Sequence, residues 1–357
     1  MLNLYQSNML DALARLYLAV REPSRDPLEP ETLLVPSHGM QRWLAFAIAR
    51  EQGVAANLDF QLPAAFTWNL LLRLHPDLPR RSPLDREPMV WRVLRELPKV
   101  LAEENAPVHH QWQAADARGR FELAWRVADV FDQYLVYRPD WVLGWEKGRC
   151  FGLGVDEAWQ GSLWQRIAGR DAPHRARLMK DFLHRAAAGE VPGLPERLGI
   201  FGVSSLPPFV WELLATLGQR IEVDVFLLNP SQEYWGQLKR GESGEGAHPL
   251  LASLGQQGRD FIATVVASGA NEPVGSAAFV APAQDTLLAT LQADLLTQHV
   301  RAPEERIAVR DDDDSVQVHV CHSALREMEV LHDQLLQLFE KHPDLNPDDV
   351  LVMCSDI

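Results

Sequence analysis

The order of strand-like and helix-like segments constrains this chain most. Short apolar runs at 2–5 and 32–35 predict strands, and each precedes a segment with apolar residues at helical spacing. The same alternation returns at 198–203, 208–217 and 221–228. Apolar strands separated by helices are typical of a parallel sheet with both faces covered. The pattern therefore predicts an α/β fold whose four strands lie parallel in one sheet.

A long stretch between these two sets of strands shows only helical patterns. Apolar residues within 66–190 recur at spacings of three and four between prolines that mark helix ends, and the segment 141–164 is rich in tryptophan. An all-helical block between βα units indicates an insertion into the α/β domain. We therefore expect a first part of the α/β domain at 1–62, an inserted all-α subdomain at 63–195, a second part at 196–310, and the start of a further domain at 311–357.

The segment after the acidic run 311–314 predicts a strand at 316–320, an amphipathic helix at 325–339 and a strand at 350–354. The sequence stops directly after this last strand pattern, within a βαβ unit. We therefore expect the chain to be a fragment of a longer protein.

Composition limits the class of protein. The 357 residues suggest more than one domain, and 46% apolar residues can fill large cores. No apolar run approaches roughly eighteen residues, and no leader pattern opens the chain, so a cytoplasmic protein without membrane contact is expected. The formal charge of −15 argues against nonspecific coating of nucleic acid, but it leaves room for a local basic channel.

The turn after the first strand lacks the chemistry of a nucleotide site. A phosphate-binding domain would place a glycine-rich loop with a lysine here, whereas this chain has Gln6, Ser7 and Asn8. We expect Asn8 to cap the following helix. The strand at 198–203 leads into Ser204 and carries no carboxylate for Mg²⁺. No cofactor is therefore expected in this chain, and ATP and Mg²⁺ chemistry would belong to partner subunits.

Other constellations fall short of a catalytic or metal site. His319, Cys321 and His322 resemble zinc ligands, but no second pair follows at zinc spacing. The sequence also contains no nuclease-like cluster of carboxylates and lysine. We predict neither catalytic nor metal-binding residues.

Several segments are specific enough to indicate a family. The most unusual is FDQYLVYRPDW at 131–141, and it is accompanied by 5–8, 36–44, 55–63, 203–208, 229–235 and 319–323. Over its whole length the chain resembles the N-terminal third of the RecC family, the gamma subunits of exodeoxyribonuclease V (the bacterial RecBCD helicase–nuclease).

The resemblance implies a superfamily 1 helicase-like fold, in which a P-loop NTPase-like sheet has a degenerate nucleotide site. The α/β parts would be domain 1A, the helical insertion domain 1B, and the end of the chain the start of domain 2A. It also implies a non-catalytic subunit that forms a channel for one DNA strand, binds RecB-like and RecD-like partners and recognises the regulatory Chi sequence. Such a subunit acts in double-strand-break repair by homologous recombination.

The resemblance assigns site residues as well. Pro36, His38 and Arg42 match positions that read Chi bases, and the best-known members of the family have amides and hydroxyls there. This departure implies a different Chi sequence, while the alternative is an ordinary exposed loop and helix start. Further positions that line the channel, or contact or support the Chi bases, are matched by Leu62, Trp68, Asp129, Val130, Asp132, Gln133, Arg138 and Arg175.

Spacing and charge refine these assignments. Asp129, Asp132 and Gln133 share one helical face. Because carboxylates repel phosphates, the two aspartates should read base amino groups or orient an arginine. The alternatives are a solvated acidic face and, for Trp68, a place in the core.

Two other functions are open at this point. One is an enzyme, such as an active helicase or an AddB-like helicase–nuclease subunit, although the missing phosphate loop argues against the helicase. The other is a protein-interaction scaffold without DNA contact, which the acidic charge favours.

Overall fold

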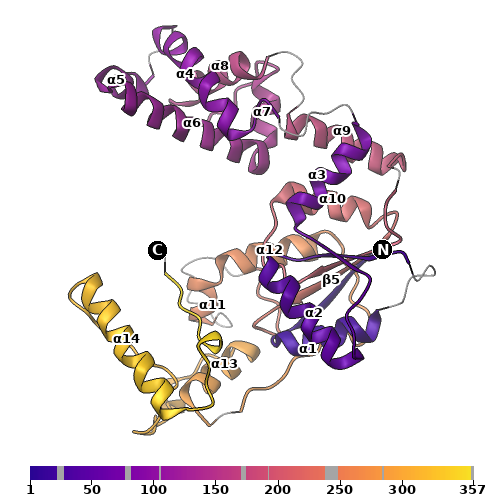
Figure 1. Ribbon diagram of the computed structural model, residues 1–357, viewed down its shortest axis with the longest axis vertical. Coiled ribbons are helices and arrows are strands. Elements are labelled where there is room, and N and C mark those ends of the chain that lie inside the picture. Colours follow the sequence, from indigo (N-terminus) through magenta and orange to yellow (C-terminus); the bar gives the residue numbers. More distant parts are fainter. Residues whose placement is uncertain are drawn as a thin grey trace. The chain divides into compact units, whose positions relative to one another are not determined.

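The computed structural model describes residues 1–21, 28–76, 82–103, 106–169, 174–191, 193–237, 248–283 and 285–354. The chain forms two compact units, one of residues 1–281 with 294–300 and one of residues 282–293 with 301–357. Figure 1 labels the helices and, among the strands, β5.

A five-stranded sheet of order β1-β5-β4-β2-β3 organises the first unit, and all its pairings are parallel. Its strands are β1 (Leu2–Ser7), β2 (Glu31–Leu34), β3 (Leu58–Gln61), β4 (Arg197–Phe201) and β5 (Glu222–Leu228). The prediction of one parallel sheet built from both ends of the helical block is confirmed. The strand β3 was not predicted, because its apolar residues alternate with Asp59 and Gln61 at a half-buried sheet edge.

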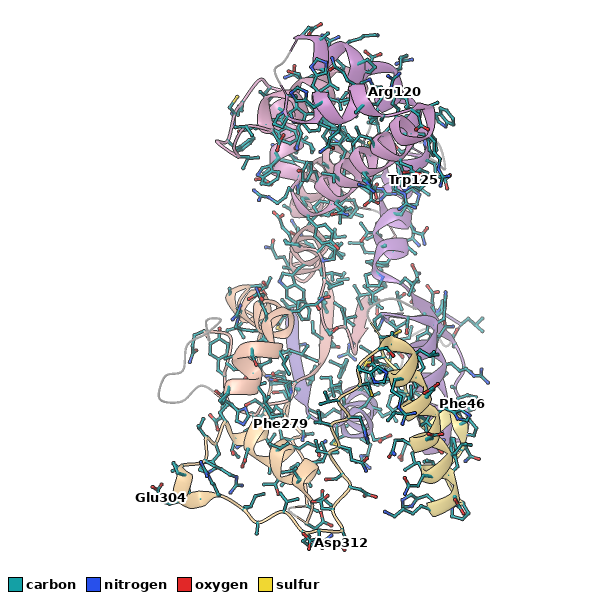
Figure 2. The ribbon with its side chains drawn as sticks, turned by 90° about the vertical axis from the view of Figure 1, so that its left-hand side faces the viewer. Phe46, Arg120, Trp125, Phe279, Glu304 and Asp312 are labelled. Atoms are coloured by element: carbon teal, nitrogen blue, oxygen red, sulfur yellow. The ribbon has the colours of Figure 1, made fainter. Side chains whose placement is uncertain are left out.

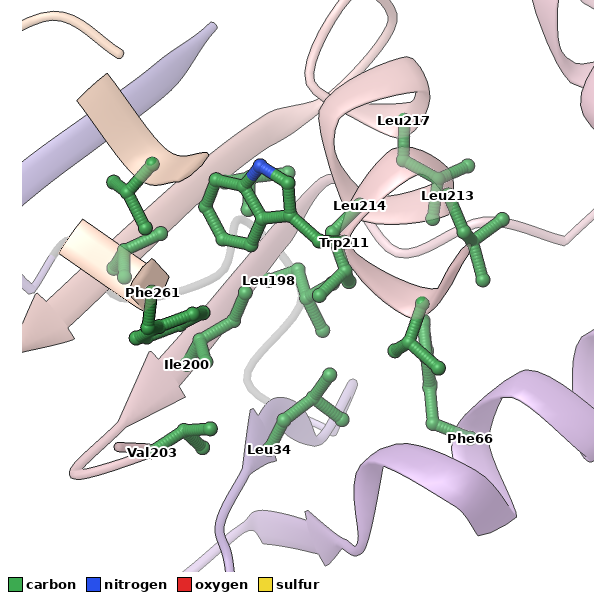
Figure 3. Close-up of a cluster of buried hydrophobic side chains, with 14 of the residues drawn as sticks. Leu34, Phe66, Leu198, Ile200, Val203, Trp211, Leu213, Leu214, Leu217 and Phe261 are labelled. Carbon is green, nitrogen blue, oxygen red and sulfur yellow. The ribbon is translucent and has the colours of Figure 1, made fainter. Parts of the chain in front are cut away.

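Adjacent residues of each strand point to opposite faces, so each strand contributes to two cores. One face carries Leu4, Leu34, Ile200 and Val225 and is covered by α3 (Pro63–Leu74), α9 (Arg175–Ala188), α10 (Pro208–Leu217) and α12 (Gln256–Ala267). Figure 3 shows Trp211 of α10 and Phe261 of α12 packed beside strand residues of this core. The other face carries Tyr5, Leu33, Phe201 and Phe226 and is covered by α1 (Leu10–Val20) and α2 (His38–Gln52).

The helices between β3 and β4 include a bundle with its own core. It consists of α4 (Arg86–Glu103), α5 (Val108–Ala114), α6 (Ala117–Tyr137), α7 (Pro139–Trp145) and α8 (Glu157–Ala168). Trp145, Trp159 and Trp164 lie in this core, and Trp141 packs against it half-buried. The tryptophan-rich segment therefore forms a helical core, as its composition predicts.

The prediction that Asn8 caps the first helix is wrong. The helix α1 begins at Leu10, and its N-cap position is Met9, without a side-chain cap. The amide of Asn8 instead donates to the carbonyl of Val280 and accepts from the backbone N–H of Val280, both at 2.8 Å. The side chain of Asn8 thus binds a segment that lies beside β1, where Gln6 and Ala277 form a bridge, and does not bind the helix start.

Further along the chain lie α11 (Pro249–Leu254) and α13 (Leu287–Thr297), and the second unit contains α14 (Ala324–Lys341) with short 3₁₀ turns at Pro303–Glu305 and Pro347–Asp349. The predicted helix at 325–339 is confirmed, but the predicted strands at 316–320 and 350–354 are wrong. Val318 is 85% exposed and Leu351 is 80% exposed, and neither segment pairs with a strand in the described ranges. An apolar run without a partner for its backbone groups does not form a strand.

Within the described part of the chain, no helix is long and apolar enough to cross a membrane.

Candidate nucleic-acid interface

A groove of about 570 Å³ opens at the carboxyl ends of β2, β3 and β4. Pro36 follows β2, Leu62 follows β3, and the loop 203–207 follows β4. Trp68 of α3 and Arg175 of α9 complete the wall. Ligands of open parallel sheets commonly bind beyond the carboxyl ends of the strands, so this groove is the candidate binding site.

The loop after β4 owes its path to local residue types. Gly202 has a φ of +66°, a left-handed conformation that favours glycine, and its N–H donates to the carbonyl of Phe226 at 2.9 Å. Pro208 then opens α10 at its first turn. Between them, Ser204 is exposed, and the hydroxyl of Ser205 accepts a hydrogen bond from Gln257 at 2.7 Å. The loop therefore presents hydroxyl groups at the groove.

Two carboxylates orient Arg175 in the groove wall. Its Nη2 lies 3.1 Å from Oδ1 of Asp85, and its Nη1 lies 3.7 Å from Oδ1 of Asp132. Burial raises the pKa of Asp132, and the guanidinium of Arg175 opposes this shift. The side chain of Arg175 is 39% exposed and lines the groove, while the two carboxylates restrict the orientation of its guanidinium.

A buried network fixes the start of the helix that carries Arg175. His174 is the N-cap residue of α9, and its Nδ1 accepts the backbone N–H of Arg177 at 3.3 Å. The Nε2–H of His174 donates to Glu146, which also accepts from Trp164 at 3.2 Å and pairs with Arg177 at 2.7 Å. Burial raises the pKa of Glu146, but the hydrogen bonds from His174 and Arg177 outweigh it and hold this pKa below its usual value.

The acidic face of α6 binds a second arginine. Asp129 accepts from Arg86 at 3.1 Å and from Gln133 at 3.0 Å, and the guanidinium of Arg86 lies 4.9 Å from the ring centre of Trp125. Each predicted aspartate of this face therefore holds an arginine. Sequence reasoning missed Arg86 and its neighbour Asp85. The sequence signal that could have indicated Asp85 is its place just before the helix α4, where its carboxylate accepts the backbone N–H of Ser82 at 3.0 Å.

His38 and Arg42 lie outside the lining of the groove. His38 is the first residue of α2, exposed, with its Nδ1 3.3 Å from Oε1 of Gln41. Arg42 is also exposed, and its guanidinium lies 5.6 Å from the ring centre of Phe46. Both residues thus project from the helix that directly follows Pro36.

Arg138 and Val130 also lie apart from the groove lining. Arg138 pairs with Asp140 at 3.0 Å and covers the ring of Trp141 at 3.7 Å. Its hydrogen bond holds the pKa of Asp140 below the usual value. Val130 lines a separate cavity of about 220 Å³ between α5, α6 and α8.

The other half of the same sheet edge, beyond β1 and β5, is filled by the chain itself. The amide of Asn229 donates to Gln6 and accepts from the indole N–H of Trp235, both at 2.9 Å. The hydroxyl of Ser7 donates to the carbonyl of Ala278 at 2.8 Å. The polar groups after β1 are therefore engaged within the chain. Among the described residues, no group of three or more His, Cys, Asp or Glu could hold a metal ion.

The parallel sheet, covered by helices on both faces, defines an α/β protein, and its carboxyl edge carries the candidate groove. Residues 2–298 match the family model described as "RecC, N-terminal domain", and the chain belongs to this family. It is 36% identical, over all of its length, to "RecBCD enzyme subunit RecC" of Escherichia coli (strain K12), of which it covers 37%. It is 31% identical over 99% of its length to the protein of the same description from Haemophilus influenzae, and 32% identical over all of its length to that from Mycolicibacterium smegmatis, covering 38% and 33% of them. The chain thus spans about a third of the length of these relatives.

Proposed function

We propose that this chain forms the DNA-channel and Chi-recognition region of a RecC subunit in a RecBCD-type exodeoxyribonuclease V, acting in the cytoplasm in double-strand-break repair by homologous recombination. The groove at the carboxyl edge carries this proposal. It combines an aromatic and apolar wall, Trp68 and Leu62, with a restrained guanidinium, Arg175. Unstacked bases pack on such walls, while guanidinium groups and hydroxyls contact base edges or phosphates.

The proposal includes a superfamily 1 helicase-like layout without an ATPase. Domain 1A would comprise 1–62 and 196–310, domain 1B would be 63–195, and 311–357 would begin domain 2A. Support comes from the single sheet built by strands on both sides of the helical block. It also comes from the β1 turn, which lacks glycine and lysine and is engaged by the segment around 278–280. ATP and Mg²⁺ would then be bound by the RecB-like and RecD-like partners.

Specificity would arise from two sets of side chains. Arg175 enters the groove already oriented by Asp85 and Asp132, so less of its conformational freedom would be lost on binding. Exposed His38 and Arg42 would read base edges of a strand that runs past Pro36. Their chemistry differs from amides and hydroxyls, so this complex would respond to its own Chi sequence.

The test is Chi response in the full complex. His38→Ala and Arg42→Ala should change Chi-dependent fragment production, because each bidentate base contact contributes about 1–3 kcal/mol of discrimination. The unwinding rate should be almost unchanged, since the motors lie in the partner subunits. Arg326→Ala, in α14, is the matched control for loss of an exposed cation. Unchanged fragment production in both test variants would refute base reading by this helix start.

A scaffold without DNA contact is the second candidate function, favoured by the formal charge of −15. Fluorescence anisotropy of labelled single-stranded DNA separates the two. Binding that weakens in Arg175→Ala supports the groove, whereas no binding by the unmodified chain supports the scaffold.

A further inference from the structure

Two large aromatic side chains lie exposed on the helical bundle, beside a third that packs against its core. Trp91 of α4 is 66% exposed and Phe121 of α6 is 37% exposed, whereas Trp125 is half-buried. Their rings form a series, with centroid distances of 5.7 Å from Trp91 to Phe121 and 6.2 Å from Phe121 to Trp125. The guanidinium of Arg86 lies over the last ring. We call this set, Arg86, Trp91, Phe121 and Trp125, the aromatic ladder. Figure 2 labels Trp125 on the bundle.

The fold does not require this exposure. The core of the bundle is filled by buried side chains that include Phe131, Trp145 and Trp164, and Trp91 is not among them. Exposed rings that gather on one face of a protein commonly mark a binding surface. The rings are tilted by 54° and 38° to their neighbours, so they form a stepped surface and not a closed stack.

A series of contacts connects the aromatic ladder to the groove. Arg86 pairs with Asp129, and the preceding residue, Asp85, pairs with Arg175 in the groove wall. The two sites are therefore joined through adjacent residues at the start of α4.

We propose that the aromatic ladder is a second binding surface for single-stranded DNA, on which unstacked bases stack against Trp91 and Phe121. The proposal rests on the proposed function, because it extends the same strand beyond the groove. Every base has a π-face, so stacking here is independent of sequence. Arg86 adds a cation over the ring of Trp125. Arg95, one turn after Trp91, pairs with Glu96 at 2.8 Å, and its side chain, 68% exposed, would reach a phosphate of the same strand.

The test uses leucine substitutions in the chain as it stands. Trp91→Leu with Phe121→Leu keeps apolar bulk but removes the π-faces, so it separates base stacking from apolar docking of a protein. Anisotropy with labelled oligo(dT) should show affinity reduced about tenfold or more, as loss of stacking predicts. Tyr234→Leu is the matched control, because Tyr234 is 48% exposed and outside the bundle. Circular dichroism would establish that each variant is folded.

A second measurement locates the contact directly. Oligonucleotides that contain 5-iodouracil should form photo-cross-links at Trp91 or Phe121, mapped by mass spectrometry. Wild-type affinity in the double leucine variant, or cross-links confined to other peptides, would overturn the aromatic ladder as a DNA site.

Arg175→Ala distinguishes this inference from the proposed function. If Arg175→Ala weakens binding while the double leucine variant binds normally, the ladder inference fails and the groove stands. If only the leucine variant weakens binding, the ladder stands and the groove fails. No DNA binding by the unmodified chain would overturn both. Loss of assembly with a RecB-like subunit at unchanged DNA affinity would assign the ladder to protein docking and also overturn the inference.

Discussion

Replacement of His174 should reveal how the fold positions Arg175. His174 is 1% exposed, caps α9 through Nδ1 and donates to Glu146 through Nε2. Alanine removes the cap, worth about 1 kcal/mol, and one donor to a buried carboxylate, worth about 1–3 kcal/mol. We therefore expect His174→Ala to lower the free energy of unfolding by about 2–4 kcal/mol.

His174→Asn is the informative partner variant. Asparagine is a good N-cap residue, but its shorter side chain does not reproduce the contact from Nε2 to Glu146. His174→Asn should therefore lower the free energy of unfolding by about 1–3 kcal/mol, the part due to the lost contact with Glu146. It should keep the part of about 1 kcal/mol that is due to the cap. Urea unfolding measures both variants. Hydrogen exchange at the amide of Arg177 compares the cap between them, because this N–H is bonded to Nδ1 of His174 at 3.3 Å as well as to the carbonyl of His174 at 3.0 Å, and only the first bond depends on the side chain.

The two measurements can contradict this reasoning separately. Equal destabilisation by alanine and asparagine, with equal exchange at Arg177, would mean that the cap contributes nothing. Wild-type stability in both would mean that the buried network is energetically unimportant. If the network positions the groove wall, single-stranded DNA affinity should fall in the order wild type, asparagine, alanine.

Other expected outcomes test the remaining contacts. Arg175→Gln should raise the pKa of Asp132 further, because burial already raises it and the guanidinium opposes that shift; carbon-detected NMR titration measures this. Gly199→Ala should lower the free energy of unfolding by about 1–3 kcal/mol, since an added Cβ would lie 2.5 Å from Cδ2 of buried Leu33; thermal unfolding checks this. Because the folded pKa of Glu146 lies below its usual 4.5, its contribution is present above pH 4.5 and is lost as pH falls through the folded value, so acid should destabilise wild type more than Glu146→Gln in urea titrations. Calorimetry with Mg-ATP should show no binding in the ~1 μM–1 mM range typical of enzyme substrates.

The sheet was predictable where strands are buried on both faces. β4 and β5 are mainly apolar and end in apolar runs, Leu198–Phe201 and Val225–Leu228, which are typical of strands whose two faces are covered. β3 was missed because an edge strand tolerates polar residues, which weakens the pattern. The segment 316–320 shows the opposite error, since its alternating valines resemble a strand but pair with no strand among the described residues. Local pattern reports the tendency of a segment, whereas pairing depends on distant residues.

In the candidate site, too, local features were predictable from the sequence and contacts between distant residues were not. Helical spacing places Asp129 and Asp132 near one another, and charge suggests that each would read base amino groups or orient an arginine. Which arginine each aspartate binds is not a local property, because Arg86 lies 43 positions from Asp129, and Arg175 is equally distant from Asp132. The role of Asp85 is equally non-local, because it lies 90 positions from Arg175. Family resemblance selected positions, and only the folded chain shows which of them line the groove.

The carboxyl edge of the sheet is divided in a way that bears on function. Beyond β1 and β5, the side chains of Ser7, Asn8 and Asn229 form hydrogen bonds within the chain. Beyond β2, β3 and β4, the edge opens into the groove with Arg175 in its wall. Asn8→Ala should therefore loosen the segment around Val280 without creating a nucleotide site, because the turn would still lack glycine and lysine. A sheet whose β1 turn is engaged by its own chain, and whose neighbouring groove is open, supports the proposal that the groove holds a DNA strand while nucleotide chemistry belongs to partner subunits.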